Sequence, residues 1–104
     1  NPDINAVFCG NDGMAMGAYQ ALLAAGKQNK VKVFGFDGAD DVVSAIKDGK
    51  ITATGMQYPA LMANTAAQFA HEYFGGRRKF PEKMPVAVEM VTRKNVDNYM
   101  AYGE

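Results

Sequence analysis

The chain has 104 residues, which limits it to a single domain, because independently folding domains most often contain about 100–150 residues. Apolar residues make up 48% of the sequence, enough for a packed core and too many for a disordered segment. Eleven basic and eleven acidic residues cancel, so the net charge offers no electrostatic footprint for nucleic acid or for an anionic membrane surface.

Three strand-like runs alternate with two helical patterns in the first half of the chain. Residues 6–9 form a short apolar run that predicts a strand buried on both faces. Residues 31–36 and 51–57 predict the second and third strands. The order β-α-β-α-β with short connections predicts right-handed crossovers, a parallel sheet and an α/β fold.

Capping residues mark the two helices between these strands. Asn11 and Asp12 are good N-cap types before the first helix, residues 14–25. Asp40 or Asp41 is expected to cap the second. The apolar stripes are carried by Met14, Ala18, Leu22 and Ala25 in the first and by Val42, Val43 and Ile46 in the second, and the closing glycines are Gly26 and Gly49.

A long helix and one further strand are expected in the second half. Pro59 suits the first turn of a helix over residues 60–74, which ends at a glycine pair. Residues 77–79 are expected as a solvated basic loop, and residues 85–91 alternate well enough for a strand. Asn95 is a candidate cap for a last helical turn. The apolar residues are Leu61, Met62, Thr65, Ala66, Phe69, Ala70 and Tyr73 in the long helix and Val96, Tyr99 and Met100 in the last turn.

Scarce residue types exclude several kinds of chemistry. Cys9 and His71 are the only cysteine and histidine, so an intramolecular disulfide and a Cys/His zinc cluster are excluded. Cys9 is expected as a buried thiol. Ser44, the single serine, lies in a predicted helix and leaves a Ser-His-Asp triad little to work with. No apolar run approaches the roughly 18 residues of a membrane span, and residues 1–3 do not resemble an export signal. We therefore predict a protein that is not an enzyme, with no metal, no cofactor and no membrane insertion.

A polar side chain follows or ends each of the three predicted strands. Asn11 follows the first strand, Asp37 the second, and Gln57 closes the third. The carboxyl ends of parallel strands share one edge, and ligands of open α/β sheets bind outside that edge. Neighbouring strands are about 4.8 Å apart, so these three side chains are expected to reach different atoms of one small molecule.

The chemistry of this trio suits a sugar. A carboxylate such as Asp37 offers only acceptors and can take both hydrogens of a vicinal diol, whereas the amides of Asn11 and Gln57 both donate and accept. A phosphate would be repelled by Asp37 unless a cation intervened. The alternative is structural, since Asn and Asp at such positions cap helices and shape turns in most α/β proteins.

Several segments resemble the motifs of one family, in order and with compatible spacing. They are similar to those of the ribose-binding-protein group of periplasmic sugar-binding proteins. The matching segments are residues 11–18 (NDGMAMGA), 35–38 (GFDG), 48–54 (DGKITAT), 57–59 (QYP) and 91–96 (VTRKNV), and residues 1–7 resemble the approach to the first strand.

The resemblance implies a fold and a function. It implies half of a periplasmic-binding-protein-like, Rossmann-like lobe, with Asn11, Asp37 and Gln57 hydrogen-bonding a bound monosaccharide such as a ribose-like pentose. It also implies two lobes that close by a hinge, here at Gln57 and Tyr58, and delivery of the sugar to the permease of an ABC transporter. The implied location is the periplasm, or the cell surface through a lipid anchor in a Gram-positive organism.

Family members are well over twice this length, so the resemblance implies a C-terminal portion with half of the sugar site. Residues 1–58 would belong to the C-terminal lobe, residues 59–90 would form a helix and strand of the N-terminal lobe, and residues 91–104 would be the tail. We expect this chain alone to bind sugar weakly or not at all. We also expect it to self-associate, because its sheet edges and the apolar face of helix 60–74 lack partners.

Two other function classes share parts of this pattern. Lac-repressor-type regulators have the same fold and similar motifs, although their second strand more often ends in Gly-x-Asp-Asn, where this chain has Gly38 after Asp37. A Rossmann-like enzyme would use Gly10, Gly13 and Gly17, whose spacing departs from G-x-G-x-x-G. The leading interpretation is a sugar-binding import receptor, and the alternative is the effector-binding domain of a regulator.

Overall fold

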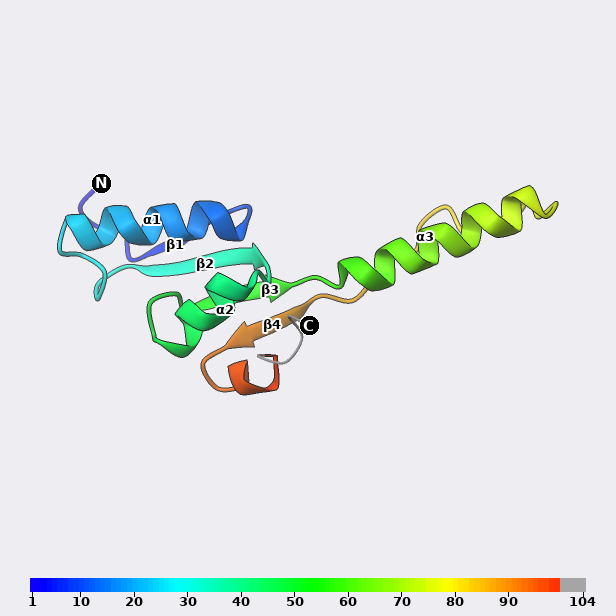
Figure 1. Cartoon of the computed structure of the whole chain (residues 1–104). Helices are drawn as coiled ribbons and strands as arrows, with labels where there is room; N and C mark the ends of the chain where they lie inside the picture. Colours follow the sequence, from blue (N-terminus) through cyan, green and yellow to red (C-terminus); the bar gives the residue numbers. More distant parts are fainter. Residues whose placement is uncertain (100–104) are drawn as a thin grey trace. The chain divides into compact units, whose positions relative to one another are not determined.

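The computed structural model describes residues 1–99 and contains one four-stranded sheet in the order β1-β2-β3-β4. The chain divides into two compact units: unit 1 comprises residues 1–56 and the chain from residue 89 onward, and unit 2 comprises residues 57–88. In chain order the elements are β1 (Ala6–Phe8), α1 (Asp12–Ala24), β2 (Lys32–Asp37), α2 (Asp40–Lys47), β3 (Ala53–Met56), α3 (Pro59–Phe74), β4 (Glu89–Thr92) and the 3-10 helix η1 (Val96–Asn98), as labelled in Figure 1.

The sheet of unit 1 is mixed. β1 pairs with β2 and β2 with β3 in parallel, which confirms the predicted β-α-β-α-β unit. The last strand runs the other way: β4 pairs antiparallel with β3, with Met56 opposite Glu89. Both crossovers run in the same direction along the sheet, so right-handed connections place α1 and α2 on one face.

The core of unit 1 lies on the face that these helices cover. Fully burying one such aliphatic side chain contributes about 1.5–3 kcal/mol. Cys9, expected as a buried thiol, is 8% exposed and so is buried as predicted. The most deeply buried apolar side chains are Val33, Val42, Ile46, Ile51, Val91 and Val96.

The prediction that the first strand is buried on both faces is wrong. β1 is the outer strand of the sheet, and Phe8 is 73% exposed. Phe8 pairs in register with Phe34 on the face opposite the helices, where Met90 is 59% exposed. An apolar run predicts burial only when some other element covers both faces, and within residues 1–99 no helix of unit 1 covers this one.

The first helix is present as predicted, but its predicted apolar stripe is partly wrong. Met14 is 54% exposed, whereas Ala15 is fully buried. The buried residues of α1 are Asp12 and Ala15, and the half-buried Leu22 lies on the same helical surface, at the i, i+3 and i+10 positions. The inward position of the Asp12 side chain therefore sets how the helix is rotated on the sheet. Gly26 has a φ of 68°, as predicted for a left-handed cap.

The second helix begins one residue earlier than its predicted caps imply. Ala39 is its N-cap, and no side chain caps it. Asp40 and Asp41 lie in the first turn instead, where carboxylates favour the positive end of the helix dipole. Gly49, with a φ of 77°, ends the helix as expected.

The last helical turn is present as η1, a 3-10 helix. Asn95 is the N-cap residue of η1, as predicted, but its side chain makes no capping hydrogen bond, because its Oδ1 accepts from the Thr92 N–H at 2.7 Å. Met100, expected in the same turn, lies outside the described residues.

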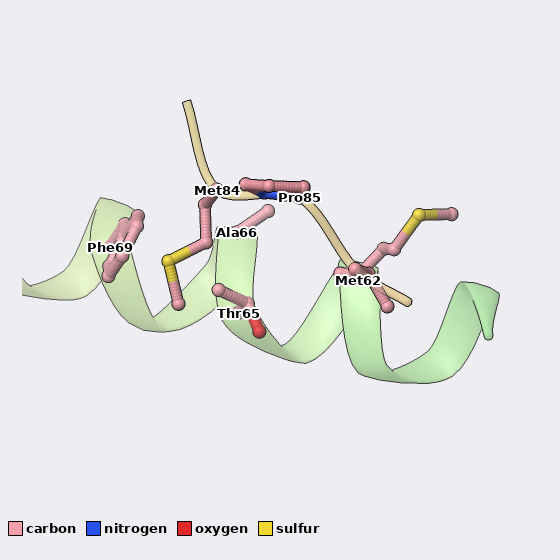
Figure 2. Close-up of a pocket in the computed structure, with 7 residues that line it drawn as sticks. Met62, Thr65, Ala66, Phe69, Met84 and Pro85 are labelled. Atoms are coloured by element: carbon pink, nitrogen blue, oxygen red, sulfur yellow. The ribbon is translucent and has the colours of Figure 1, made fainter. Parts of the chain in front are cut away.

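Unit 2 is built on α3, which starts with Pro59 in its first turn and ends before Gly75, as predicted. The predicted strand 85–91 is shorter than expected, since β4 begins only at Glu89. Figure 2 shows Met84 and Pro85 lying along α3, where they help to form an apolar groove. Within the described part of unit 2 there is no strand, so residues 85–88 have no ladder to join. The groove is lined by Met62, Thr65, Ala66, Phe69, Met84, Pro85 and Val86.

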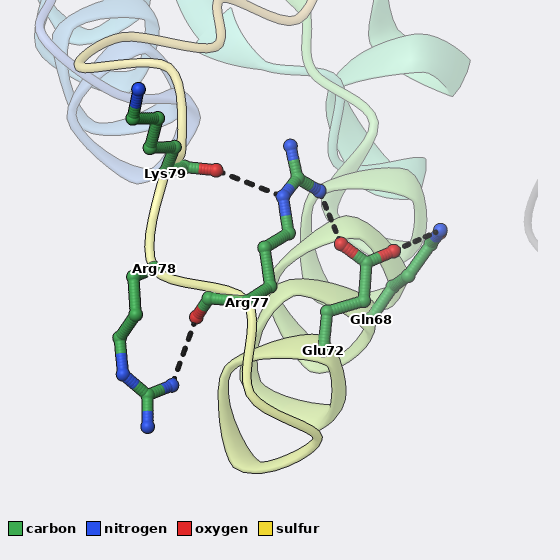
Figure 3. A network of polar contacts seen from close by, with 5 residues as sticks. All are labelled: Gln68, Glu72, Arg77, Arg78 and Lys79. Carbon is green, nitrogen blue, oxygen red and sulfur yellow. Dashed lines mark hydrogen bonds and ion pairs between the residues drawn. The ribbon is translucent and has the colours of Figure 1, made fainter.

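The basic loop at residues 77–79 is tied to α3 rather than solvated throughout. The Arg77 guanidinium pairs with the Glu72 carboxylate, and its Nε donates to the Lys79 carbonyl at 2.8 Å (Figure 3). It also lies 4.6 Å from the ring centroid of Phe80 and 5.4 Å from that of Phe69. One arginine thus holds the loop against the end of the helix.

We expect the pKa of Glu72 to be below its ordinary value of 4.5, because hydrogen bonds from Arg77 and then from Gln68 favour the ionised carboxylate. A depressed pKa in the folded state means that this pairing stabilises unit 2 above about pH 4.5, and that the contribution is lost as the pH falls through the lower folded pKa. A side-chain carboxyl NMR titration measures it directly. Arg77→Met should raise the midpoint toward 4.5, whereas Arg78→Met should leave it unchanged; a wild-type midpoint of 4.5 or higher would contradict the pairing.

Candidate functional site

The candidate site lies at the carboxyl edge of the three parallel strands. β2 ends at Asp37, which pairs in register with Met56, the last residue of β3. α1 begins at the same edge, with three residues between the end of β1 and its first residue. Asp40 and Asp41 begin the helix that follows β2, so this edge collects aspartates and disfavours an anionic ligand.

Asn11 has the structural role that the sequence left open. It is the N-cap of α1, and its Oδ1 accepts a hydrogen bond from the Met14 N–H at 2.8 Å. Its side chain is nevertheless exposed at the strand edge. The cap uses one lone pair of the oxygen and leaves the NH₂ group, with its two donors, for a ligand. The two interpretations of Asn11 are therefore compatible.

Asp37 occupies a strained bend. Its φ is 131°, and it is the one non-glycine residue with a positive φ among residues 1–99. Such a conformation costs on the order of 1–3 kcal/mol and concentrates at functional sites. Gly38 continues the bend with a φ of 88°, and a Cβ there would lie 2.8 Å from side-chain atoms of Met56. A side chain at residue 38 would clash with Met56, so this position needs glycine. Residue 37 has a positive φ as well but carries an aspartate.

Asp12 is the site residue that the sequence reasoning missed. Its side chain is only 2% exposed, and its Oδ2 accepts hydrogen bonds from the N–H groups of Gly38 at 2.9 Å and Ala39 at 2.7 Å. Its Oδ1 accepts one from the Thr54 hydroxyl at 2.6 Å. An aspartate next to an N-cap is ordinarily an exposed first-turn residue, which is why its sequence position did not reveal it.

Gly35 is the sequence signal from which Asp12 was detectable. A Cβ added to Gly35 would overlap Oδ1 of Asp12 and lie 3.2 Å from the Cβ of Ala15. A glycine inside a strand marks a close approach by another part of the chain, and here that part is a buried carboxylate. The Gly-Phe-Asp-Gly segment thus has two glycines that make room for different side chains.

Gln57 and Tyr58, the predicted ligand and hinge residues, begin unit 2. Gln57 directly follows the last residue of β3 and is half-buried, and Tyr58 is the N-cap of α3. The structure brings Asn11 and Asp37 to one edge of unit 1, because Asp12, next to Asn11, binds the backbone next to Asp37. The ligand roles of all three residues remain predictions.

Within residues 1–99, no group of three or more His, Cys, Asp or Glu side chains is arranged to hold a metal ion. In the same part of the chain, no helix has the length and apolar character required to cross a membrane.

Comparison with known proteins identifies the family. The family model described as "Periplasmic binding protein domain" matches residues 1–78. The chain belongs to the periplasmic binding protein family. This confirms the resemblance of the motifs and accounts for the α/β architecture with a parallel β-α-β-α-β unit.

Relatives in the family include proteins named for sugar import. The ribose import binding protein RbsB of Salmonella typhimurium is 42% identical over 94 residues, which are 90% of this chain and 31% of that protein. The D-apiose import binding protein of Paraburkholderia graminis is 44% identical over 96 residues, 91% of this chain and 30% of that protein. The chain thus spans about a third of the length of these relatives.

Solved structures of periplasmic binding proteins have the same fold. An ABC transporter periplasmic solute-binding protein from Actinobacillus succinogenes with bound D-allose has a TM-score of 0.87 at 33% identity, covering 95% of this chain and 35% of its own. An ABC transporter solute-binding protein from Bacillus halodurans with bound myo-inositol has a TM-score of 0.85 at 35% identity, covering 95% of this chain and 34% of its own.

The cap role of Asn11 predicts a difference between two substitutions. Asn11→Ala removes the Oδ1 acceptor and should lower the free energy of unfolding by about 1 kcal/mol. Asn11→Ser keeps a hydroxyl that caps the same N–H and should stay within a few tenths of a kcal/mol of the wild type. Urea denaturation of the 104-residue chain, followed by circular dichroism, measures both, and equal losses would mean that the cap is not the reason for Asn11's contribution.

Proposed function

We propose that this chain supplies one side of a monosaccharide-binding site in a solute-binding protein that delivers the sugar to an ABC transporter. The observation that carries the proposal is Asp37, an exposed carboxylate presented on a strained bend at the carboxyl end of β2. Strain at one polar residue of a strand edge is expected where the side chain has to be aimed at a ligand.

The donor and acceptor pattern of this edge supports a neutral, hydroxyl-rich ligand. Asp37 accepts from two hydroxyl groups, the NH₂ group of Asn11 donates to sugar oxygens, and the Gln57 amide both donates and accepts. The neighbouring aspartates disfavour phosphate. Ribose, apiose, D-allose and myo-inositol, after which the relatives are named or with which they were solved, are all polyols of this kind.

The division of the chain supports two lobes joined by a hinge. The sequence-based division at residues 58/59 and 90/91 lies close to the unit boundaries at 56/57 and 88/89. Because β4 pairs with β3 and Val91 and Val96 are buried, we assign β4 and η1 to the C-terminal lobe with residues 1–58, and residues 59–88 to the N-terminal lobe, with the hinge at Gln57 and Tyr58. In this proposal closure brings further ligand contacts to Asn11 and Asp37, so the chain alone binds sugar weakly.

The cellular role follows from the family. We propose that the protein acts in the periplasm, or at the cell surface through a lipid anchor, and passes its sugar to a permease without chemical change. Its relatives are solute-binding proteins rather than enzymes. The basic loop at residues 77–79 is a candidate permease contact. Lys79 is the residue proposed for it, because the Arg77 side chain pairs with Glu72 and the Arg78 guanidinium donates to the Tyr73 carbonyl at 2.7 Å.

Asp37→Gly separates sugar binding from folding. It removes the carboxylate, so we expect affinity for the preferred sugar to fall about 100-fold or more, from the loss of two charge-assisted hydrogen bonds. It also relieves the positive φ, so the fold should become more stable by about 1 kcal/mol. Calorimetry with D-ribose, D-allose, D-apiose and myo-inositol, on the protein expressed at the length its gene encodes, measures the affinity.

Asp37→Asn is the matched control, because it removes the charge and keeps both the shape and the strained backbone. It should lose affinity without the gain in stability. Unchanged sugar affinity in both variants would refute the proposed function.

We further propose that the 104-residue chain self-associates through the face of the sheet that carries Phe8, Phe34 and Met90. Its support is the exposure of Phe8 and Met90 and the position of β1 at the edge of the sheet. Sedimentation equilibrium should show a mass that rises with concentration. Phe8→Lys should shift the chain toward monomer, while Met14→Lys, at an apolar position of α1 that is also more than half exposed, should have little effect. A wild-type chain that is monomeric at every concentration would contradict this.

A further inference from the structure

The bend that presents Asp37 is not stable by itself. An L residue rarely adopts a φ of 131°, and such a conformation persists only when the surroundings over-determine it. The two residues after Asp37 leave the sheet edge and enter α2, whose N-cap Ala39 has no side-chain cap. Some other group must therefore fix the backbone directly after Asp37.

The Asp12 carboxylate is that group. A single oxygen, Oδ2, accepts from the consecutive N–H groups of Gly38 and Ala39, at 2.9 and 2.7 Å. Two consecutive N–H groups converge on one acceptor only when both of their peptide units turn toward it, so this contact selects the bent conformation. The hydrogen bonds thus act on the peptide planes that determine where the Asp37 side chain leaves the backbone.

The position of Asp12 is itself set by three elements. Its backbone starts α1 directly after Asn11, its Oδ1 is held by the Thr54 hydroxyl of β3 at 2.6 Å, and its oxygen occupies the space that the missing side chain of Gly35 leaves in β2. At 2% exposure the carboxylate is shielded from water that would compete for these bonds.

We propose that Asp12 is a positioning residue for sugar binding: it touches no sugar, and it holds the Asp37 bend in the conformation that receives the sugar before the sugar arrives. The inference rests on the proposed function of Asp37. The added claim is that sugar affinity depends on Asp12, a buried side chain whose hydrogen-bond partners are Gly38, Ala39 and Thr54. A pre-formed bend spares the ligand the cost of ordering it.

A carboxylate makes the strongest hydrogen bonds available at this position. A carboxylate accepts at both oxygens, which matches two N–H donors on one side and a hydroxyl on the other. Asp12→Asn has the same shape but no charge: with its NH₂ group turned to the Thr54 hydroxyl, which can also accept, its oxygen makes only neutral hydrogen bonds to the Gly38 and Ala39 N–H groups. The variant therefore tests the hydrogen bonds with little change in packing volume.

The decisive measurement compares sugar affinity with stability in the protein expressed at the length its gene encodes. Asp12→Asn should weaken binding of the preferred sugar by about tenfold or more, the equivalent of one lost charge-assisted hydrogen bond. Val96→Ala is the control, since Val96 is a buried aliphatic side chain of η1, 2% exposed, and η1 is not one of the segments that carry Asn11, Asp12 and Asp37. It should lower the urea midpoint and change sugar affinity by less than about twofold.

Equal affinity losses in Asp12→Asn and Val96→Ala would overturn the proposal, because both would then act through general stability. Unchanged affinity in Asp12→Asn would overturn it as well. Asp37→Asn, measured beside them, separates the two claims. If Asp37→Asn loses affinity and Asp12→Asn does not, only the positioning role fails; if Asp37→Asn binds normally, the proposed function fails.

A second measurement needs no variant and covers the case in which Asp12→Asn does not fold. In the unmodified 104-residue chain without sugar, NMR should detect scalar couplings across the hydrogen bonds from the Gly38 and Ala39 amides to the Asp12 carboxylate carbon. Those amides should also exchange with solvent more slowly than the amide of Asp41, which begins the same helix without such a bond. Absent couplings and fast exchange before sugar is added would show that the bend is not pre-formed and would refute the inference.

Discussion

The buried carboxylate of Asp12 is the interaction on which the architecture of this edge depends. It joins the start of α1 to backbone 26 and 27 residues later and to a hydroxyl 42 residues later. Burying an ionisable group without partners is costly, but both oxygens of this one are satisfied by donors from separate elements. The carboxylate thereby holds three segments in one arrangement: the start of α1, the bend after β2, and β3 at Thr54.

Two glycines show how closely the chain is built around that interaction. Gly35 leaves room for the carboxylate itself, and Gly38 leaves room for Met56 while it turns the chain toward α2. Between them Phe36 and Asp37 complete the strand, and Asp37 carries the strained backbone. The strain is tolerated because the two N–H groups that follow Asp37 are held by a carboxylate that is already buried, so the bend has little freedom to relax.

In the proposed function, the residues that hold this edge together differ from those that contact the sugar. Asp12 contributes only to the protein, Asn11 divides its amide between a helix cap and the strand edge, and Asp37 is aimed by its neighbours. Polyol ligands suit such an edge because many weak hydroxyl contacts demand accurate placement of each partner rather than a single strong charge. The sheet face opposite the helices, with Phe8 and Met90, is by contrast an apolar surface whose burial the described residues do not provide.

The sequence by itself determined the elements and the family, because these depend on local periodicity, caps and short motifs. The crossover order, α3 from Pro59 to Phe74 and the closing glycines Gly26 and Gly49 are all local signals that the structure confirms. Only the tertiary structure decided which faces are covered, and so it exposed Phe8 and shortened the strand expected at 85–91. It also decided the role of Asp12, since a residue that reads as an ordinary first-turn aspartate becomes the centre of the edge only when Gly35, Gly38 and Thr54 are brought to it by packing.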